Sequence, residues 1–156
     1  MIEGTFTKSS PEEQLRKNGW LLQTTVGRSM EPMLYDRRSL VRIERLTRSP
    51  QKYDVLLFRR PSGEYVLHRV LRVGETACMI RGDNCVAAEK VPNEWLLGVL
   101  TAFSLDGAEM TPVTDKKYQA YVRRHCWVYP LRDTARFFKR GMRKAIKILK
   151  TGRKQG

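Results

Sequence analysis

The chain has 156 residues, enough for about one domain with its own hydrophobic core, and its formal net charge of +14 points to an anionic partner. Its three cysteines, Cys78, Cys85 and Cys126, are odd in number and lack Cys-x-x-Cys spacing, which argues against a disulfide framework and a zinc site. No stretch reaches the ~18 consecutive apolar residues of a membrane span, and residues 1–10 lack the apolar core of a signal peptide. We therefore expect a cytoplasmic protein with no metal and no cofactor.

A short helix is predicted close to the N-terminus, at residues 11–18. Ser10 and Glu13 have the spacing of a capping box, and Pro11 falls at the first helical position. Gly19 is suited to end the helix because glycine readily adopts a left-handed conformation.

Strands are predicted from residue 20 onward. Short runs rich in β-branched and aromatic residues alternate with turn formers, a pattern typical of a mostly β fold. Pro61-Ser62-Gly63 predicts a hairpin turn between two of these runs. The runs are residues 20–26, 40–43, 55–58, 65–73, 77–80 and 95–103.

Three residues of this β region are candidates for a hydrolytic site. A serine such as Ser29 is a weak nucleophile at neutral pH, so it needs an imidazole to accept its proton and an acid to orient that imidazole. The chain has only two histidines: His68 lies in a strand-like run, whereas His125 lies in a basic stretch. Asp83, in Gly-Asp-Asn, completes the order Ser, His, Asp.

Each of the three has a purely structural alternative. His68 lies between Val66 and Val70 on one strand face, because side chains alternate, and would also fit as a hydrogen-bonded core residue. Ser29 would also fit as a turn or helix-capping serine, and Asp83 as an ordinary turn aspartate.

Four short motifs surround these residues between positions 24 and 102. They are Gly-Arg-Ser-Met-Glu-Pro-Met at 27–33, Tyr-Asp-Val-Leu-Leu-Phe at 53–58, Val-Leu-His-Arg-Val at 66–70 and Arg-Gly-Asp-Asn at 81–84. In this order and spacing they resemble the signal peptidase I and LexA-type superfamily of serine peptidases. Bacterial signal peptidases and repressors carry a lysine at the base position; His68 instead resembles the archaeal and endoplasmic-reticulum signal peptidases.

The resemblance implies a signal-peptidase/LexA-like β fold and a serine endopeptidase. Ser29 would attack the peptide carbonyl, His68 would act as general base and then general acid, and Asp83 would orient the imidazole. The backbone N–H groups of Ser29 and Met30 are expected to form the oxyanion hole. The substrate would be a peptide or a leader or precursor protein, bound in extended form at a sheet edge.

Two turns depart from the family pattern. Relatives usually carry Gly-Asp where this chain has Tyr35-Asp36, and again where it has Tyr53-Asp54. Each pair keeps the aspartate and loses the glycine. Because glycine is the default residue for positive φ, these turns are predicted either to have negative φ or to be mildly strained.

Charge divides the chain unevenly. Residues 1–115 contain 16 Lys and Arg against 15 Asp and Glu, whereas residues 116–156 contain 14 against one. In residues 131–150 apolar side chains recur at three- and four-residue steps between the basic ones, which predicts a basic amphipathic helix. These apolar residues are Leu131, Ala135, Phe138, Met142, Ala145, Ile146 and Leu149.

We therefore divide the chain into a helical lead-in at 1–19, a catalytic β domain at 20–115 and a basic aromatic and amphipathic helical tail at 116–156. The tail is expected to bind an anionic membrane surface through residues 131–150, which would make the protein peripheral at the inner face of the membrane. A helix packed on the β domain is one alternative. Nucleic-acid binding is another, because aromatic residues lie beside basic ones and LexA-type relatives bind DNA; those relatives, however, use a helix-turn-helix domain for which residues 1–19 are too short.

A second function stays open at this point. The same fold would serve a non-catalytic or self-cleaving regulator with a nucleic-acid-binding basic tail.

Overall fold

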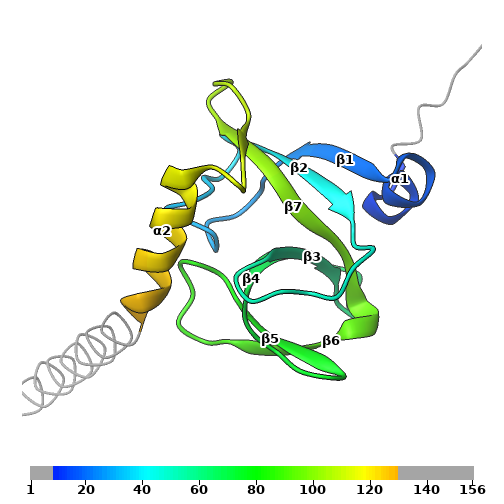
Figure 1. Ribbon diagram of the computed structural model, residues 1–156. Helices are drawn as coiled ribbons and strands as arrows, with labels where there is room; N and C mark the ends of the chain where they lie inside the picture. The colour runs from blue at the N-terminus through cyan, green and yellow to red at the C-terminus, as the bar shows by residue number, and fades with distance from the viewer. Residues whose placement is uncertain (1–8, 130–156) are drawn as a thin grey trace, which may run out of the picture. The chain divides into compact units, whose positions relative to one another are not determined.

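The computed structural model describes residues 9–129, and within this range it contains one antiparallel sheet of eight strands (Figure 1). The prediction of a mostly β fold is confirmed. The chain divides into two compact units between Asp115 and Lys116. The first unit holds α1 (Pro11–Asn18), β1 (Trp20–Thr24), β2 (Ser39–Arg45), β3 (Val55–Arg59), β4 (Tyr65–Val73), β5 (Ala77–Arg81), β6 (Glu89–Pro92), the 3-10 turn η1 (Asn93–Trp95), β7 (Leu96–Leu105) and β8 (Thr111–Pro112), and the second holds α2 (Lys116–Trp127).

The predicted N-terminal helix is confirmed, with Ser10 as its N-cap and Gly19 at its end, and among the described residues only the Ser10 half of the capping box is formed. The Ser10 side chain accepts a hydrogen bond from the Glu13 backbone N–H at 3.2 Å, and Pro11 opens the helix. The Glu13 carboxylate pairs with Lys17 at 2.9 Å. Gly19 ends the helix at φ 78° and donates its backbone N–H to the Leu15 carbonyl, so the last turn is closed as the sequence predicts.

The strand order in the sheet is β1-β2-β7-β3-β4-β5-β6, with β8 beside β7. The long strand β7 lies between β2 and β3, so a late segment of the chain joins the N-terminal strands to the β3–β4 hairpin (Figure 1). The predicted turn between β3 and β4 is present, with Gly63 at φ 88°. The strands β6 and β8 were not predicted, because each is short and has little apolar content.

Buried hydrophobic residues come from both halves of the sheet, and one cluster of them is formed by the strands β3 to β6. All four residues 55–58 of β3 are buried, which means that both faces of this strand are covered. Full burial of each such side chain contributes roughly 1.5–3 kcal/mol. This cluster consists of Leu56, Phe58, Val66, Val70, Cys78, Ile80 and Val91.

A fully buried ion pair connects β4 to the loop after β5. The guanidinium of Arg69 donates to both carboxylate oxygens of Asp83, at 2.7 Å each, and neither side chain is exposed. The same guanidinium donates to the Tyr53 carbonyl at 3.1 Å and contacts the Met33 sulfur at 3.0 Å. One side chain therefore joins three loops of the first unit.

Two non-glycine residues in the turns of interest have positive φ. Tyr53 has φ 75°, in the left-handed region that favours glycine, so this turn is mildly strained. In the earlier turn the positive φ falls on Arg37, at 56°, two residues after Tyr35. Tyr35 itself does not have positive φ, so the alternative of negative φ holds at that position.

Residues 9–129 contain no helix that is both long and apolar enough to cross a membrane. The amphipathic helix predicted for residues 131–150 lies outside the described residues.

We predict that replacing Arg69 by Met lowers the free energy of unfolding by roughly 3–5 kcal/mol, because it leaves Asp83 charged and unpaired in the interior. Urea unfolding followed by circular dichroism measures this loss. Arg38→Met is the matched control, since Arg38 pairs with Asp106 at an exposed position where ion pairs contribute little. Equal losses in the two variants would contradict a special role for the buried pair.

Candidate active site

Ser29 lies at the start of a tight turn that is anchored in the core. Met30, Met33 and Leu34 are buried, and the backbone N–H groups of Met33 and Leu34 both donate to the Met30 carbonyl at 3.0 Å. This three- and four-residue spacing turns the apolar side chains inward. Ser29 is left partly exposed at the adjacent pocket.

Asn84 holds this turn from the opposite loop. Its backbone N–H donates to the Ser29 carbonyl at 2.8 Å, and its side-chain amide donates to the Arg28 carbonyl at 3.0 Å. The Gly-Asp-Asn motif therefore fixes the serine loop through its asparagine, a role that sequence analysis did not assign.

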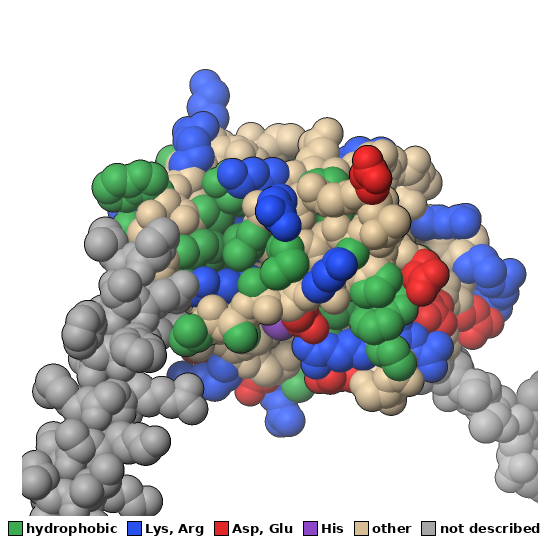
Figure 2. Space-filling model, turned by 90° about the horizontal axis from the view of Figure 1, so that it is seen from below, with side chains coloured by type: hydrophobic (Ala, Val, Ile, Leu, Met, Phe, Trp, Pro, Cys, Tyr) green, Lys and Arg blue, Asp and Glu red, His purple; other side chains and the backbone are tan. Residues whose placement is uncertain are grey.

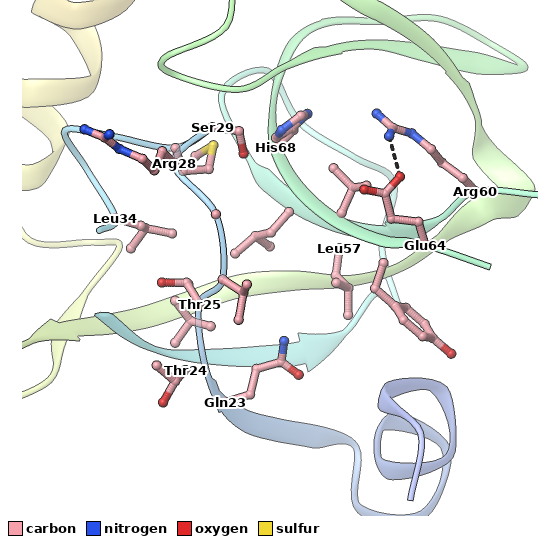
Figure 3. Close-up of a pocket in the computed structure, with 17 residues that line it drawn as sticks. Gln23, Thr24, Thr25, Arg28, Ser29, Leu34, Leu57, Arg60, Glu64 and His68 are labelled. Carbon is pink, nitrogen blue, oxygen red and sulfur yellow. Dashed lines mark hydrogen bonds and ion pairs between the residues drawn. The ribbon is translucent and has the colours of Figure 1, made fainter. Parts of the chain in front are cut away.

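His68 reaches the same pocket from β4. The residue is only 7% exposed, and it shares its strand face with the buried Val66 and Val70, as the alternation predicts. Figure 3 shows the side chains of Ser29 and His68 directed toward one another across the pocket. Within the described residues the Ser29 hydroxyl makes no hydrogen bond.

Gly82 allows these two residues to approach. A Cβ atom at this position would lie 2.6 Å from the Ser29 carbonyl oxygen and 2.9 Å from Nε2 of His68, both too close for a side chain. The Nε2 atom therefore lies on the side of the ring that adjoins the serine loop. This is the nitrogen that a general base would use toward Ser29.

The other ring nitrogen faces a carboxylate that the sequence analysis missed. His68 Nδ1 lies 3.3 Å from Oε1 of Glu89, at the long end of the hydrogen-bonding range, and among the described residues it has no well-aligned partner. Catalytic hydrogen bonds are often loose before substrate binds. Glu89 lies on the unpredicted strand β6; the available sequence signal was that it is the next acidic residue after Asp83.

Asp83 lies close to the imidazole of His68, but it pairs with Arg69. Both of its carboxylate oxygens accept from Arg69, and its charge has only a minor effect on the imidazole. The structure thus brings Ser29, His68 and Glu89 together, whereas Asp83 is the partner of Arg69.

The pKa of His68 is lowered, and burial of the ring is the main cause. The charge of Glu89 and its contact with the ring oppose this shift, whereas the positive charge of Arg60 adds to it. The imidazole is therefore neutral at neutral pH, the form in which Nε2 can accept a proton.

The pocket beside Ser29 and His68 has a volume of about 380 Å³. Residues of β1, β2, β3 and β4 line it, and in the sheet the strand β7 separates the first two of these strands from the other two (Figure 3). Within the described residues the backbone N–H groups of Ser29 and Met30 donate no hydrogen bond. No group of three or more His, Cys, Asp or Glu side chains converges in residues 9–129 in a way that would hold a metal ion.

Comparisons of the chain with models of known protein families, with curated proteins and with solved structures find no match. The motifs and the geometry of this pocket are therefore what indicates a function.

Proposed function

We propose that the protein is a serine endopeptidase that cleaves a peptide or a leader or precursor protein. The observation that carries the proposal is the convergence of Ser29 and His68 on one pocket, with a carboxylate on the far nitrogen of the imidazole. A neutral histidine with a carboxylate at one ring nitrogen is suited to activate a serine hydroxyl near the other. The resemblance to signal-peptidase motifs supports the same reaction.

The reaction would proceed through an acyl-enzyme. His68 Nε2 accepts the hydroxyl proton as Ser29 Oγ bonds to the scissile carbonyl carbon, and the N–H groups of Ser29 and Met30 stabilise the oxyanion. The imidazolium then gives its proton to the leaving amine as the C–N bond breaks. Water, deprotonated by the same nitrogen, hydrolyses the ester and restores the serine.

Two carboxylates are candidates for stabilising the imidazolium. The resemblance predicts Asp83 for this role, but the contact at Nδ1 favours Glu89. Asp83 would contribute indirectly, by holding Arg69 and the loop that carries Asn84.

The substrate would bind as an extended strand. β1 is an end strand of the sheet, and residues 23–29 run along one wall of the pocket. A peptide laid along this wall can hydrogen-bond to backbone groups of a free sheet edge, which places its carbonyl beside Ser29.

We predict that Ser29→Ala and His68→Gln each abolish cleavage of a peptide library, because loss of a triad member costs on the order of 10⁴ to 10⁶ in turnover. His125→Gln is the control and should remain active. Mass spectrometry of the cleaved peptides measures the rates, and circular dichroism checks the fold. Wild-type rates in the Ser29→Ala protein would exclude the serine mechanism, and a wild type that cleaves nothing and is not itself cleaved would favour the non-catalytic regulator.

The pH dependence follows from the lowered pKa of His68. Activity requires the neutral ring, so kcat/KM should be level at neutral pH and fall only below the ordinary histidine range of about 6.5. Glu89 raises the pKa of the ring, so Glu89→Gln should move this acidic limb to lower pH while kcat drops on the order of 10²-fold or more. A limb that moves to higher pH, or an unchanged kcat, would contradict the assignment of Glu89.

We also propose that the basic tail attaches the protein to an anionic membrane surface. The first unit is nearly neutral by sequence, and Figure 2 shows its basic side chains interspersed with acidic and hydrophobic ones. α2 by itself exposes Lys116, Lys117, Arg123 and Arg124, and its Trp127 is 77% exposed. Basic side chains beside an exposed tryptophan suit the headgroup region of a bilayer.

The full chain is therefore expected to float with vesicles that contain anionic lipid, and to do so more weakly but still measurably in high salt. Replacing Phe138, Met142 and Ile146 together by Ser should abolish flotation in high salt. The same chain should bind DNA or RNA only weakly. Nucleic-acid binding that falls steeply with salt, together with no flotation, would favour the nucleic-acid tail instead.

A further inference from the structure

We infer that Arg60 is a positioning residue for the candidate active site: its guanidinium holds the Glu89 carboxylate against Nδ1 of His68. This inference rests on the proposed function for its consequence in catalysis. The contact on which it depends is visible in the protein without substrate.

The guanidinium and the carboxylate meet through several short contacts. Arg60 Nη2 lies 2.8 Å from Oε1 and 2.9 Å from Oε2 of Glu89, and Nε lies 3.2 Å from Oε2. Oε1 is also the oxygen that faces His68 Nδ1 at 3.3 Å. One oxygen atom is thus shared between Arg60 and His68, and the planar fork of the guanidinium fixes the orientation of the carboxylate.

Arg60 is itself held by the hairpin that carries it. Its backbone N–H donates to the Glu64 carbonyl at 2.9 Å, and its Nη1 donates to the Glu64 carboxylate at 2.7 Å, the contact drawn as a dashed line in Figure 3. The turn between β3 and β4 therefore sets the place of the guanidinium. Arg60 and Glu64 both line the pocket, so this arrangement forms one of its rims.

Arg60 also affects how the charge of Glu89 acts on the protonation of His68. A carboxylate beside an imidazole favours the protonated ring and so opposes its role as a general base. The charged groups that face His68 are Glu89 from β6, Arg60 from the β3–β4 turn and Asp83 from the loop after β5; Asp83 is paired with Arg69. Arg60 offsets the charge of Glu89, so the carboxylate can orient the ring without protonating it.

An ordinary surface ion pair would neither orient the Glu89 carboxylate toward His68 nor affect the pKa of the imidazole. Arg60 and Glu89 are each about one third exposed, and pairs of this kind contribute little to stability. The titration of His68 and the balance between kcat and KM therefore distinguish positioning from a structural role.

The test is a nuclear magnetic resonance titration of the two histidines in the full chain, with His125→Gln used to assign their signals. In Arg60→Met the pKa of His68 should rise, because a nearby positive charge is lost and Glu89 is no longer offset. Arg60→Lys keeps the charge and should titrate close to wild type. Arg59→Met is the matched control; Arg59 adjoins Arg60 but pairs with Glu12 at 3.4 Å, so His68 should be unaffected.

Peptide cleavage gives the second readout. Arg60→Met should lower kcat about tenfold or more while KM changes less than about twofold, and its acidic limb should move to higher pH. Arg60→Lys should restore the wild-type position of the acidic limb of the pH profile but only part of kcat, because an ammonium lacks the planar fork of a guanidinium.

An unchanged titration of His68 in Arg60→Met, or an equal shift in Arg59→Met, would overturn the inference. The titration needs no substrate, so it decides the coupling even if the wild-type protein cleaves no peptide. Absence of cleavage would then count against the proposed function alone.

Discussion

The buried ion pair between Arg69 and Asp83 is the interaction on which the site depends. Its guanidinium contacts Asp83, the Tyr53 carbonyl and the sulfur of Met33, so it connects the loop after β5, the turn before β3 and the turn that carries Ser29. A charge without access to water must stay paired, and separating these loops would leave one unpaired in the interior. The distance between the serine turn and β4 is therefore fixed by residues that need not take part in the reaction.

Two opposing effects act on the pKa of the His68 imidazole. Burial among apolar residues disfavours its charged form, whereas Glu89 at Nδ1 favours it. Burial has the larger effect, so the ring is neutral at neutral pH, while Glu89 would favour the charged ring that the proposed reaction forms. The pairing of Glu89 with Arg60 keeps this balance at the rim of the pocket, while Gly82 leaves Nε2 room to face the serine loop.

Sequence predicted the parts of this arrangement that depend on local pattern. Alternation on β4 placed His68 with Val66 and Val70, and the caps Ser10 and Gly19 defined α1, because these signals lie within a few neighbouring residues. Glu89 could not be found in this way, since its contact with His68 depends on the pairing of β6 with β5. The same holds for the partner of Asp83, because the local sequence of a turn aspartate is the same whether it contacts an imidazole or a buried arginine.

The central claim is that His68 makes Ser29 nucleophilic. Incubation of the full chain with a fluorophosphonate ester tests it most directly, because attack by Ser29 Oγ on phosphorus releases fluoride and leaves a stable adduct. Intact-mass spectrometry followed by peptide mapping should find one adduct, located on Ser29, in the wild type and almost none in His68→Gln. An unlabelled Ser29 in the folded wild-type protein, or equal labelling of the two proteins, would contradict the account.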